Sequence, residues 1–163
     1  MDVVDNFLPV REFKDLQNHI ISPNGIQFTI QPTVSDDTDD EYWCWYAQHL
    51  VFNDGMPITQ TYNRLYQIFR NKLPDFRAFI RIKINFYPHT EVLREHPKHT
   101  DADYSHKAAV FSLNTCDGFT RMHDGSIIDS VENRIVFFDA SKEHNSTTTT
   151  NFHGRYNINF NYL

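Results

Sequence analysis

The stretch FIRIKINFY at residues 79–87 alternates between two kinds of side chain. Successive residues of a β-strand point to opposite faces, so one face of this strand is apolar and the other is polar. The apolar face consists of Ile80, Ile82, Ile84 and Phe86. The polar face consists of Arg81, Lys83, Asn85 and Tyr87. This pattern predicts a sheet with helices behind its apolar face and a functional cavity in front of its polar face.

The stretch RYNINFNYL at residues 155–163 alternates in the same way. Its polar face carries one cation followed by three amides, namely Arg155, Asn157, Asn159 and Asn161. Such a row is unusual in a core strand and typical of a strand that lines a polar cavity. A guanidinium also matches a carboxylate with two parallel hydrogen bonds. The alternative is that Arg155 is a solvated residue of an edge strand, where charged side chains are common.

The remaining elements follow from helical or alternating spacing of apolar residues. Helices are expected at 9–20 and at 57–73, where Pro74 ends the second one. Strands or strand-like segments are expected at 1–8, 26–30, 42–52, 108–113, 119–122, 126–129 and 134–138. Helices followed by many short strands with tight turns predict a mainly β chain with N-terminal α-helices and an antiparallel β-core.

Length and composition narrow the class of protein. A chain of 163 residues fits a single domain, 1–163. Its net charge of -6 makes nucleic acid an unlikely partner, and its two cysteines form no disulfide framework. No apolar run is long enough to span a membrane, so a soluble, cytoplasmic protein is expected, in the host cytoplasm if the chain is viral.

The acidic run at 35–41 is interpreted as a solvated loop, with a cation site as the less favoured alternative.

A metal site is indicated by His99 and Asp101, which point to the same face of an extended segment. Together they supply two ligands of a 2-His-1-carboxylate triad, the non-haem iron(II) site with open positions. The pair alone is a weak signal, because the pattern is expected about once by chance in a chain of this composition. His123, His144 and His153 are the candidates for the third ligand. His144 is favoured because it follows the strand at 134–138 and precedes Arg155 by eleven residues.

Five stretches place these residues in a recognisable order: IKINFYPHT (82–90), HTDAD (99–103), FSLNTCDGFTRMHDG (111–125), ENRIVFFDASKEHNSTTTT (132–150) and RYNINFNY (155–162). Together they resemble the Fe(II)/2-oxoglutarate-dependent dioxygenases, and in particular the short prolyl-4-hydroxylase-like proteins of phages and marine microbes. The resemblance covers residues 78–163 well and the N-terminal half loosely. Asp117-Gly118 stands where the family usually has Gly-Gly.

The resemblance implies a double-stranded β-helix (jelly-roll, cupin-like) as the catalytic core over 78–163, supported by residues 1–77. It implies that iron(II) is bound by His99, Asp101 and His144. It further implies that 2-oxoglutarate is the cosubstrate, with O2 as oxidant and ascorbate as an optional reductant. The residues expected to bind 2-oxoglutarate are Arg155, Asn157, Tyr87 and Asn85.

The implied reaction is the oxidative decarboxylation of 2-oxoglutarate to succinate and CO2, coupled to hydroxylation of an unactivated C–H bond. The branch implies a peptidyl, prolyl-type side chain as substrate, and a free amino acid or small metabolite is the alternative. Residues 88–98 and 102–107 are expected to form a lid, and Asp103, Asp139 and Asn145 are candidates to accept a hydrogen bond from a ligand histidine. A non-catalytic jelly-roll binding domain and a cupin-like metal protein without a 2-oxoacid remain open, as does the oligomeric state.

Overall fold

The computed structural model describes residues 1–34 and 41–163, so all of the acidic run except Glu41 lies outside the described residues. The described part contains two α-helices, α1 (Val10–Ile21) and α2 (Thr61–Phe69). Its strands are β1 (Asp2–Val4), β2 (Thr29–Gln31), β3 (Tyr46–Asn53), β4 (Met56–Pro57), β5 (Phe79–Pro88), β6 (Lys107–Ser112), β7 (Phe119–Met122), β8 (Ile127–Asp129), β9 (Ile135–Asp139), β10 (His144–Ser146) and β11 (Gly154–Tyr162).

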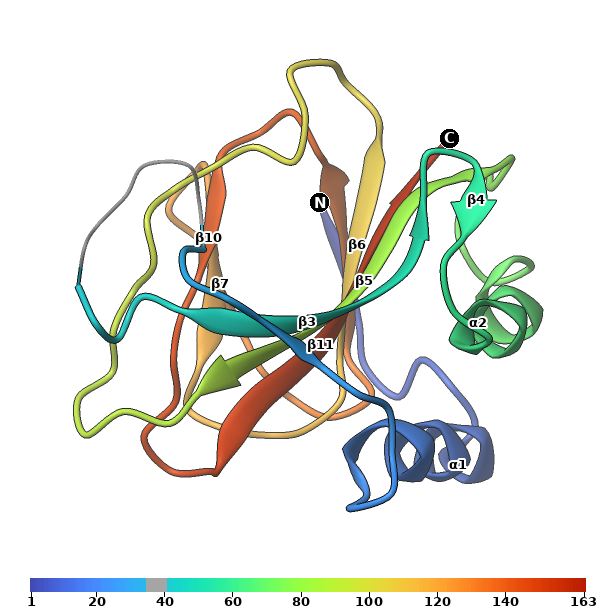
Figure 1. Ribbon diagram of the computed structural model, residues 1–163. Helices are drawn as coiled ribbons and strands as arrows, with labels where there is room; N and C mark the ends of the chain where they lie inside the picture. Colours follow the sequence, from blue (N-terminus) through green and yellow to red (C-terminus); the bar gives the residue numbers. More distant parts are fainter. Residues whose placement is uncertain (35–40) are drawn as a thin grey trace.

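The strands form two antiparallel sheets. The large sheet has the order β1-β9-β6-β11-β5-β3-β2, with β4 paired to β3, and the small sheet has the order β10-β7-β8. Helices α1 and α2 lie on one side of the large sheet, and β7 and β10 lie on the other (Figure 1). The prediction of a mainly β chain with N-terminal helices and a jelly-roll core is confirmed.

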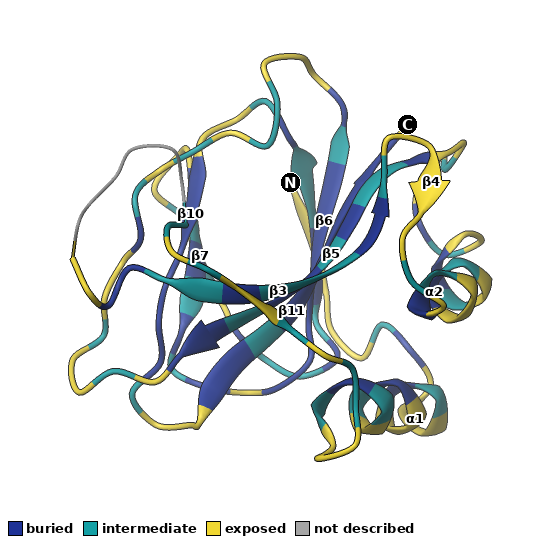
Figure 2. Cartoon of the chain, viewed as in Figure 1, coloured by how far each residue is buried: buried dark blue, intermediate teal, exposed yellow. Residues whose placement is uncertain are grey.

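The hydrophobic core lies between the helices and the back of the large sheet. Helix α1 buries Phe13, Leu16 and Ile20, which recur at helical spacing. Helix α2 buries Leu65 and Phe69. These side chains pack against the apolar face of β5 and β11, and the outer sides of both helices are exposed (Figure 2). Neither helix of the described residues is long and apolar enough to cross a membrane.

The structure contains a β-hairpin between β3 and β4 that the sequence analysis did not predict. Asp54 and Gly55 both have positive φ, of 47° and 80°. This backbone turns β3 back on itself, so that Asn53 pairs with Met56 and Phe52 with Pro57. Residues 56–57 are therefore strand, and α2 begins at Thr61 rather than at residue 57. Strand β3 also begins later than predicted, at Tyr46.

Strand β11 lies inside the large sheet, hydrogen-bonded to β5 on one side and to β6 on the other. The interpretation of Arg155 as a solvated edge residue is therefore wrong, and its side chain is only 1% exposed. One face of β11 packs in the hydrophobic core with Ile158 and Phe160, and the other carries the buried polar row, so apolar and polar residues alternate along it.

Candidate metal centre and its cavity

Two rows of polar side chains face each other across the pairing of β5 with β11. In an antiparallel pair, directly opposite residues project from the same face of the sheet. The register therefore builds a ladder of four polar pairs on the front of the large sheet: Arg81 with Asn161, Lys83 with Asn159, Asn85 with Asn157, and Tyr87 with Arg155. We call these four pairs the polar ladder. All four of its β11 members are buried.

The backbone brings His99 and His144 together at one end of this ladder. Each donates its N–H to the other's carbonyl, at 3.0 and 2.9 Å, so the two residues form an isolated antiparallel bridge. Opposite residues of such a bridge share a face, and both rings point into one cavity. The Asp101 N–H donates to the Ala140 carbonyl at 3.0 Å, which fixes the third residue beside them.

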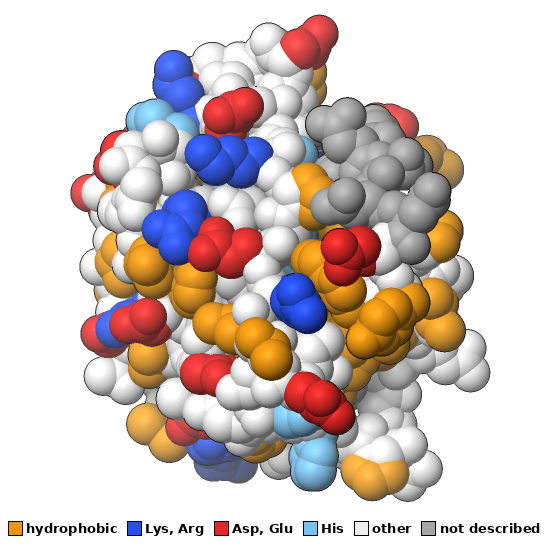
Figure 3. Space-filling view, turned by 90° about the vertical axis from the view of Figure 1, so that its left-hand side faces the viewer, with side chains coloured by type: hydrophobic (Ala, Val, Ile, Leu, Met, Phe, Trp, Pro, Cys, Tyr) orange, Lys and Arg blue, Asp and Glu red, His pale blue; other side chains and the backbone are white. Residues whose placement is uncertain are grey.

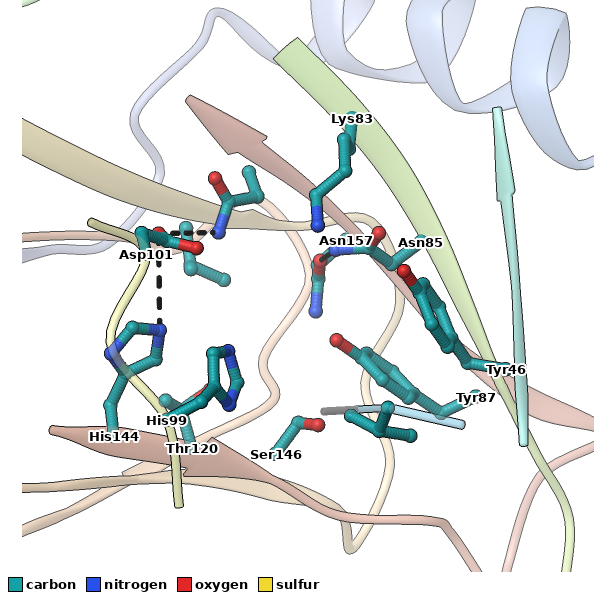
Figure 4. A pocket seen from close by; sticks show the side chains of 13 residues that line it. Tyr46, Lys83, Asn85, Tyr87, His99, Asp101, Thr120, His144, Ser146 and Asn157 are labelled. Carbon is teal, nitrogen blue, oxygen red and sulfur yellow. Dashed lines mark hydrogen bonds and ion pairs between the residues drawn. The ribbon is translucent and has the colours of Figure 1, made fainter. Parts of the chain in front are cut away.

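The side chains of His99, Asp101 and His144 turn toward one another (Figure 4). One ligand atom from each lies within 4.8 Å of the others, and His144 Nε2 is 3.9 Å from Asp101 Oδ2. Two imidazoles and one carboxylate in such a cluster form a donor set that suits iron(II) and leaves coordination positions open. The structure places His123 and His153 at the exposed surface instead.

The hydrogen bond of His144 sets which nitrogen is free. Its Nδ1 lies 3.0 Å from the Lys142 carbonyl oxygen, which can only accept, so in the neutral ring Nδ1 is the nitrogen that carries the proton and Nε2 is the one that faces the cavity. The acceptor is thus a backbone carbonyl. Of the three side chains predicted for this role, Asp139 accepts from Ser105 and Ser141.

The other two predicted acceptors also fail to reach the ring. Asn145 donates to Glu95, and Asp103 is exposed. The protonation of His99 is set by its surroundings: burial, followed by the charge of His144, lowers its pKa to about 4. The imidazole of His99 is therefore neutral near neutral pH, as a metal ligand must be.

Asp101 is held by three neighbours that sequence reasoning did not assign to the site. Arg81 Nη2 donates to Oδ1 at 2.7 Å, and the Nδ2 atoms of Asn159 and Asn161 each lie 3.3 Å from Oδ2. Burial favours the neutral acid, but the opposing charges of His144 and Arg81 keep the pKa of Asp101 below its usual value. The carboxylate is thus ionised and fixed in orientation.

Arg155 lies at the opposite end of the polar ladder. Its Nη2 donates to Thr120 Oγ1 at 2.7 Å, and its guanidinium carbon lies 5.5 Å from the ring centre of Tyr87. Its Nε and Nη1 are buried, and no described residue accepts a hydrogen bond from either. Burial lowers the pKa of Arg155, yet guanidinium stays charged in proteins. A buried cation with two free donors is a site for an anion.

A glycine makes room for this guanidinium. A Cβ at Gly118 would lie 2.8 Å from Arg155 Cδ and 2.7 Å from the Thr148 carbonyl oxygen. Asp117, which precedes it, accepts hydrogen bonds from Thr149 and Thr150 and so fixes the neighbouring loop. The Asp-Gly sequence therefore keeps the close approach for which a glycine is needed at position 118.

Between the two ends, the cavity is lined by amides and hydroxyls. Asn85 Nδ2 donates to Asn157 Oδ1 at 3.1 Å, and the Tyr87 side chain is hydrogen-bonded to Ser146 and Asn157. Six of the seven predicted site residues line this cavity: His99, Asp101, His144, Asn85, Asn157 and Tyr87. The seventh, Arg155, contacts two of its lining residues, Tyr87 and Thr120.

No protein-family model and no curated protein sequence matches the chain. Its structure is nevertheless similar to an oxidoreductase of the 2OG-Fe(II) oxygenase family from Burkholderia pseudomallei, with a TM-score of 0.69, 14% identity and coverage of 98% of this chain and 82% of that one. The chain has the fold of the 2-oxoglutarate- and iron(II)-dependent oxygenases.

Two prolyl hydroxylases share this oxygenase fold with the chain. One is a viral collagen prolyl hydroxylase from Paramecium Bursaria Chlorella virus-1, with a TM-score of 0.65, 15% identity and coverage of 98% and 93% of the two chains. The other is a Pseudomonas putida prolyl-4-hydroxylase, with a TM-score of 0.63, 14% identity and coverage of 99% and 91%. The resemblance found in the sequence is thereby confirmed at the level of the fold.

Within this oxygenase fold, residues 88–98 do not form the predicted lid. Thr90 and His96 donate backbone hydrogen bonds to Thr149 and Ser146, and Arg94 accepts one from Thr148, at 2.9–3.0 Å. The segment is therefore attached to the chain beyond β10 as a wall of the cavity. Residues 102–107 remain a predicted lid.

Proposed function

We propose that the chain is an Fe(II)- and 2-oxoglutarate-dependent dioxygenase that hydroxylates an unactivated C–H bond. The observation that carries the proposal is the buried guanidinium of Arg155, whose two free donors lie next to the cavity that the His99–Asp101–His144 cluster lines. A metal-chelating oxoacid with a second carboxylate satisfies both ends of this arrangement. In a protein that binds only a metal, the buried guanidinium of Arg155 would be left without an anion.

In this proposal His99, Asp101 and His144 hold the iron, and Arg155 pairs with the carboxylate of 2-oxoglutarate that does not reach the metal. Bound iron supplies the oxidation by O2, in which 2-oxoglutarate becomes succinate and CO2 and the substrate gains a hydroxyl group. Tyr87 covers the guanidinium and excludes water from it. Asn85 and Asn157 offer hydrogen bonds to the cosubstrate between the two ends.

The residues around the iron ligands act as positioning groups. Arg81, Asn159 and Asn161 keep the Asp101 carboxylate ionised and in place. The Lys142 carbonyl keeps His144 in the tautomer that presents Nε2 to the cavity. Because Arg81, Asn159 and Asn161 stand on β5 and β11, the large sheet orients the Asp101 carboxylate before any metal binds.

For the substrate, a peptidyl, prolyl-type side chain is the first candidate, supported by the two prolyl hydroxylases of similar structure. A free amino acid or small organic acid is the second candidate. A specific observation favours it, namely the ammonium group of Lys83 in the wall of the cavity. Cytoplasmic location and the optional use of ascorbate stay predictions.

The test is turnover of 2-oxoglutarate to succinate without added substrate, in the presence of Fe(II) and O2. We expect the wild-type protein to form succinate, and His144→Ala and Arg155→Met to lose at least about 100-fold in rate or in affinity for 2-oxoglutarate. His153→Ala, which changes an exposed histidine, is the matched control.

Each alternative hypothesis predicts a different result in this assay. A non-catalytic binding domain forms no succinate at all. A cupin-like metal protein binds the metal through His99 and His144 but is indifferent to Arg155→Met. Activity that survives His144→Ala would show that a different residue is the third ligand.

A further inference from the structure

Lys83 lies in the polar ladder between the metal cluster and the amide pair Asn85–Asn157. Its side chain lines the cavity and points into it (Figure 4). Within residues 1–34 and 41–163, its ammonium group makes no hydrogen bond or ion pair. Its one recorded contact is with the ring of Tyr46, whose centre lies 5.9 Å away. A half-buried ammonium without a partner is unfavourable unless a ligand supplies an acceptor.

The nearby carboxylate is not available to Lys83. Arg81 occupies Asp101 Oδ1 at 2.7 Å, and Asn159 and Asn161 approach Oδ2. A metal ion bound by Asp101 would compete further for the same oxygens. The ammonium of Lys83 thus has a free donor face in a cavity whose only nearby anion, among the described residues, is already bound by other groups.

The spacing of the ladder separates this ammonium from the cosubstrate. One step between pairs is two residues, roughly 6.6 Å along a strand. The four C–C bonds of 2-oxoglutarate span at most about 6 Å between its carboxyl carbons. An oxoacid anchored at Arg155 therefore lies beside the Asn85–Asn157 pair, one step away, from where it reaches across the cavity to the metal ligands, whereas Lys83 stands a second step along the strand.

The contacts of the neighbouring residues agree with this order. Arg81, the next residue in the same polar row, donates to Asp101 at the metal end, and Tyr87, at the other end, lies against Arg155. Lys83 therefore lines the part of the cavity next to the metal ligands, two pairs away from Arg155, where a substrate must present its C–H bond.

Building on the proposed function, we propose that Lys83 binds a carboxylate of the substrate. The substrate then carries a carboxylate within a few bonds of the carbon that is oxidised. A free amino acid or a small organic acid has such a group, and so does an acidic side chain in a peptide. An internal, uncharged residue such as a peptidyl proline does not. Lys83 is thus a specificity-determining residue, which selects substrates that carry a carboxylate.

The test measures binding to protein loaded with Mn(II) and 2-oxoglutarate, by thermal shift and calorimetry. The probes are the free amino acids and C2–C6 carboxylic acids, each paired with its amide, and capped peptides that contain internal aspartate, glutamate or proline. Wild type is compared with Lys83→Met, with Lys83→Arg and with Lys98→Met, an exposed lysine as control. We expect at least one acid to bind at least about tenfold more tightly than its amide to the wild type.

We expect Lys83→Met to reduce the affinity for that acid to the level of its amide, Lys83→Arg to keep part of the preference, and Lys98→Met to behave as wild type. The affinity for 2-oxoglutarate should change less than about twofold in all four proteins. Binding confined to the free acids identifies a small-molecule substrate, and binding of the aspartate or glutamate peptides identifies an acidic side chain.

Three results would overturn the inference. One is a tenfold loss of 2-oxoglutarate affinity in Lys83→Met, which assigns the ammonium to the cosubstrate. Another is a capped proline peptide that binds wild type and Lys83→Met equally well. The third is that no carboxylate probe binds the wild type at millimolar concentration. The proposed function fails separately, if the wild type neither binds 2-oxoglutarate nor forms succinate.

Discussion

Arg155 and Lys83 are two cations of this cavity that we expect to lower the stability of the unliganded protein. Among the described residues neither cation is paired with a carboxylate, although Arg155 is 1% exposed and Lys83 is half-buried in the wall of the cavity. An unpaired buried charge destabilises a fold, and a ligand that pairs with it restores the loss. Replacing either cation is therefore expected to stabilise the protein without ligand, whereas replacing an ordinary core residue destabilises it.

Replacement of Arg155 by Met tests this expectation. We expect the variant to melt roughly 2–8 °C above the wild type without ligand, because a buried guanidinium with two free donors is removed. We also expect 2-oxoglutarate with Mn(II) to raise the melting temperature of the wild type but not that of the variant. Differential scanning calorimetry measures both, with Arg121→Met, at an exposed ion pair, as control. A variant still stabilised by 2-oxoglutarate would contradict the assignment of Arg155.

The pKa of Lys83 leads to a prediction about stability and pH. Burial, followed by the charge of Arg81, lowers this pKa from 10.5 to about 8, and Asp101 opposes the shift. A lysine whose pKa is lower in the folded than in the unfolded state reduces the free energy of unfolding while both states are protonated. This loss of stability becomes smaller as the pH rises from 8 toward 10.5. Lys83→Met should therefore be more stable than wild type at pH 7, by at most roughly 3 kcal/mol.

Urea denaturation at pH 7, 9 and 10 measures this difference, which should shrink as the pH increases. Tyr46, His99 and Asp101 also face Lys83, and they are present in both proteins. Lys98→Met should show no comparable trend. A difference that stays constant with pH would mean that the ammonium is not the cause.

Strands β5 and β11 show what alternation in a sequence can and cannot predict. The faces were predictable, because apolar and polar residues alternate with period two in both. The register was not, since it depends on contacts between residues more than sixty positions apart. The contacts of Asp101 with Arg81, Asn159 and Asn161 follow from that register, so the sequence alone could name these residues as polar but not assign them to the metal end.

Strand β10 and the wall at 88–98 illustrate a second limit. A three-residue strand has too few residues for any periodicity, and β10 forms because His144 and Ser146 pair with Met122 and Thr120 of β7. Segment 88–98 lacks apolar alternation, and its backbone bonds go to residues 146–149. Both depend on tertiary pairing, which local sequence does not encode. His144 could still be predicted as a ligand, from its spacing to Arg155.

The loop before β7 allows a test of the close approach at Gly118. We expect Gly118→Ala to weaken 2-oxoglutarate binding at least about tenfold, because a Cβ there meets Arg155 Cδ and the Thr148 carbonyl. Gly125→Ala is the matched control. It has a positive φ of 84° and open space around it, so it should lose about 1 kcal/mol of stability with unchanged affinity. Equal affinities in the two variants would contradict the steric argument.

In the molecule as a whole, one amphipathic sheet serves two purposes. Its apolar side forms the core with α1 and α2, and its polar side faces the small sheet across the cavity. On the face shown in Figure 3, basic side chains lie beside acidic ones. That interspersed pattern agrees with the expectation that nucleic acid is not the partner, which remains a prediction.

Metal removal provides a test for the molecule as a whole. Because the sheet and the His99–His144 bridge set the ligand geometry, we expect the protein treated with a chelator to keep its far-ultraviolet circular dichroism and to melt cooperatively. Added Mn(II) should raise its melting temperature by a few degrees. His99→Ala and His144→Ala should show no such increase, and His123→Ala should behave as wild type. Unfolding on chelation would contradict a preformed site.

The cluster of His99, Asp101 and His144 also bears on which metal the proposed site would acquire. Two imidazoles and one carboxylate are donors that all first-row divalent ions accept. Its affinities should then follow the Irving–Williams order, with cobalt, nickel and copper bound more tightly than iron. Occupancy by iron would depend on which metals the surrounding compartment makes available at the time of loading. Purified protein should accordingly carry the metals of its growth medium, and elemental analysis after growth on different media measures that dependence directly.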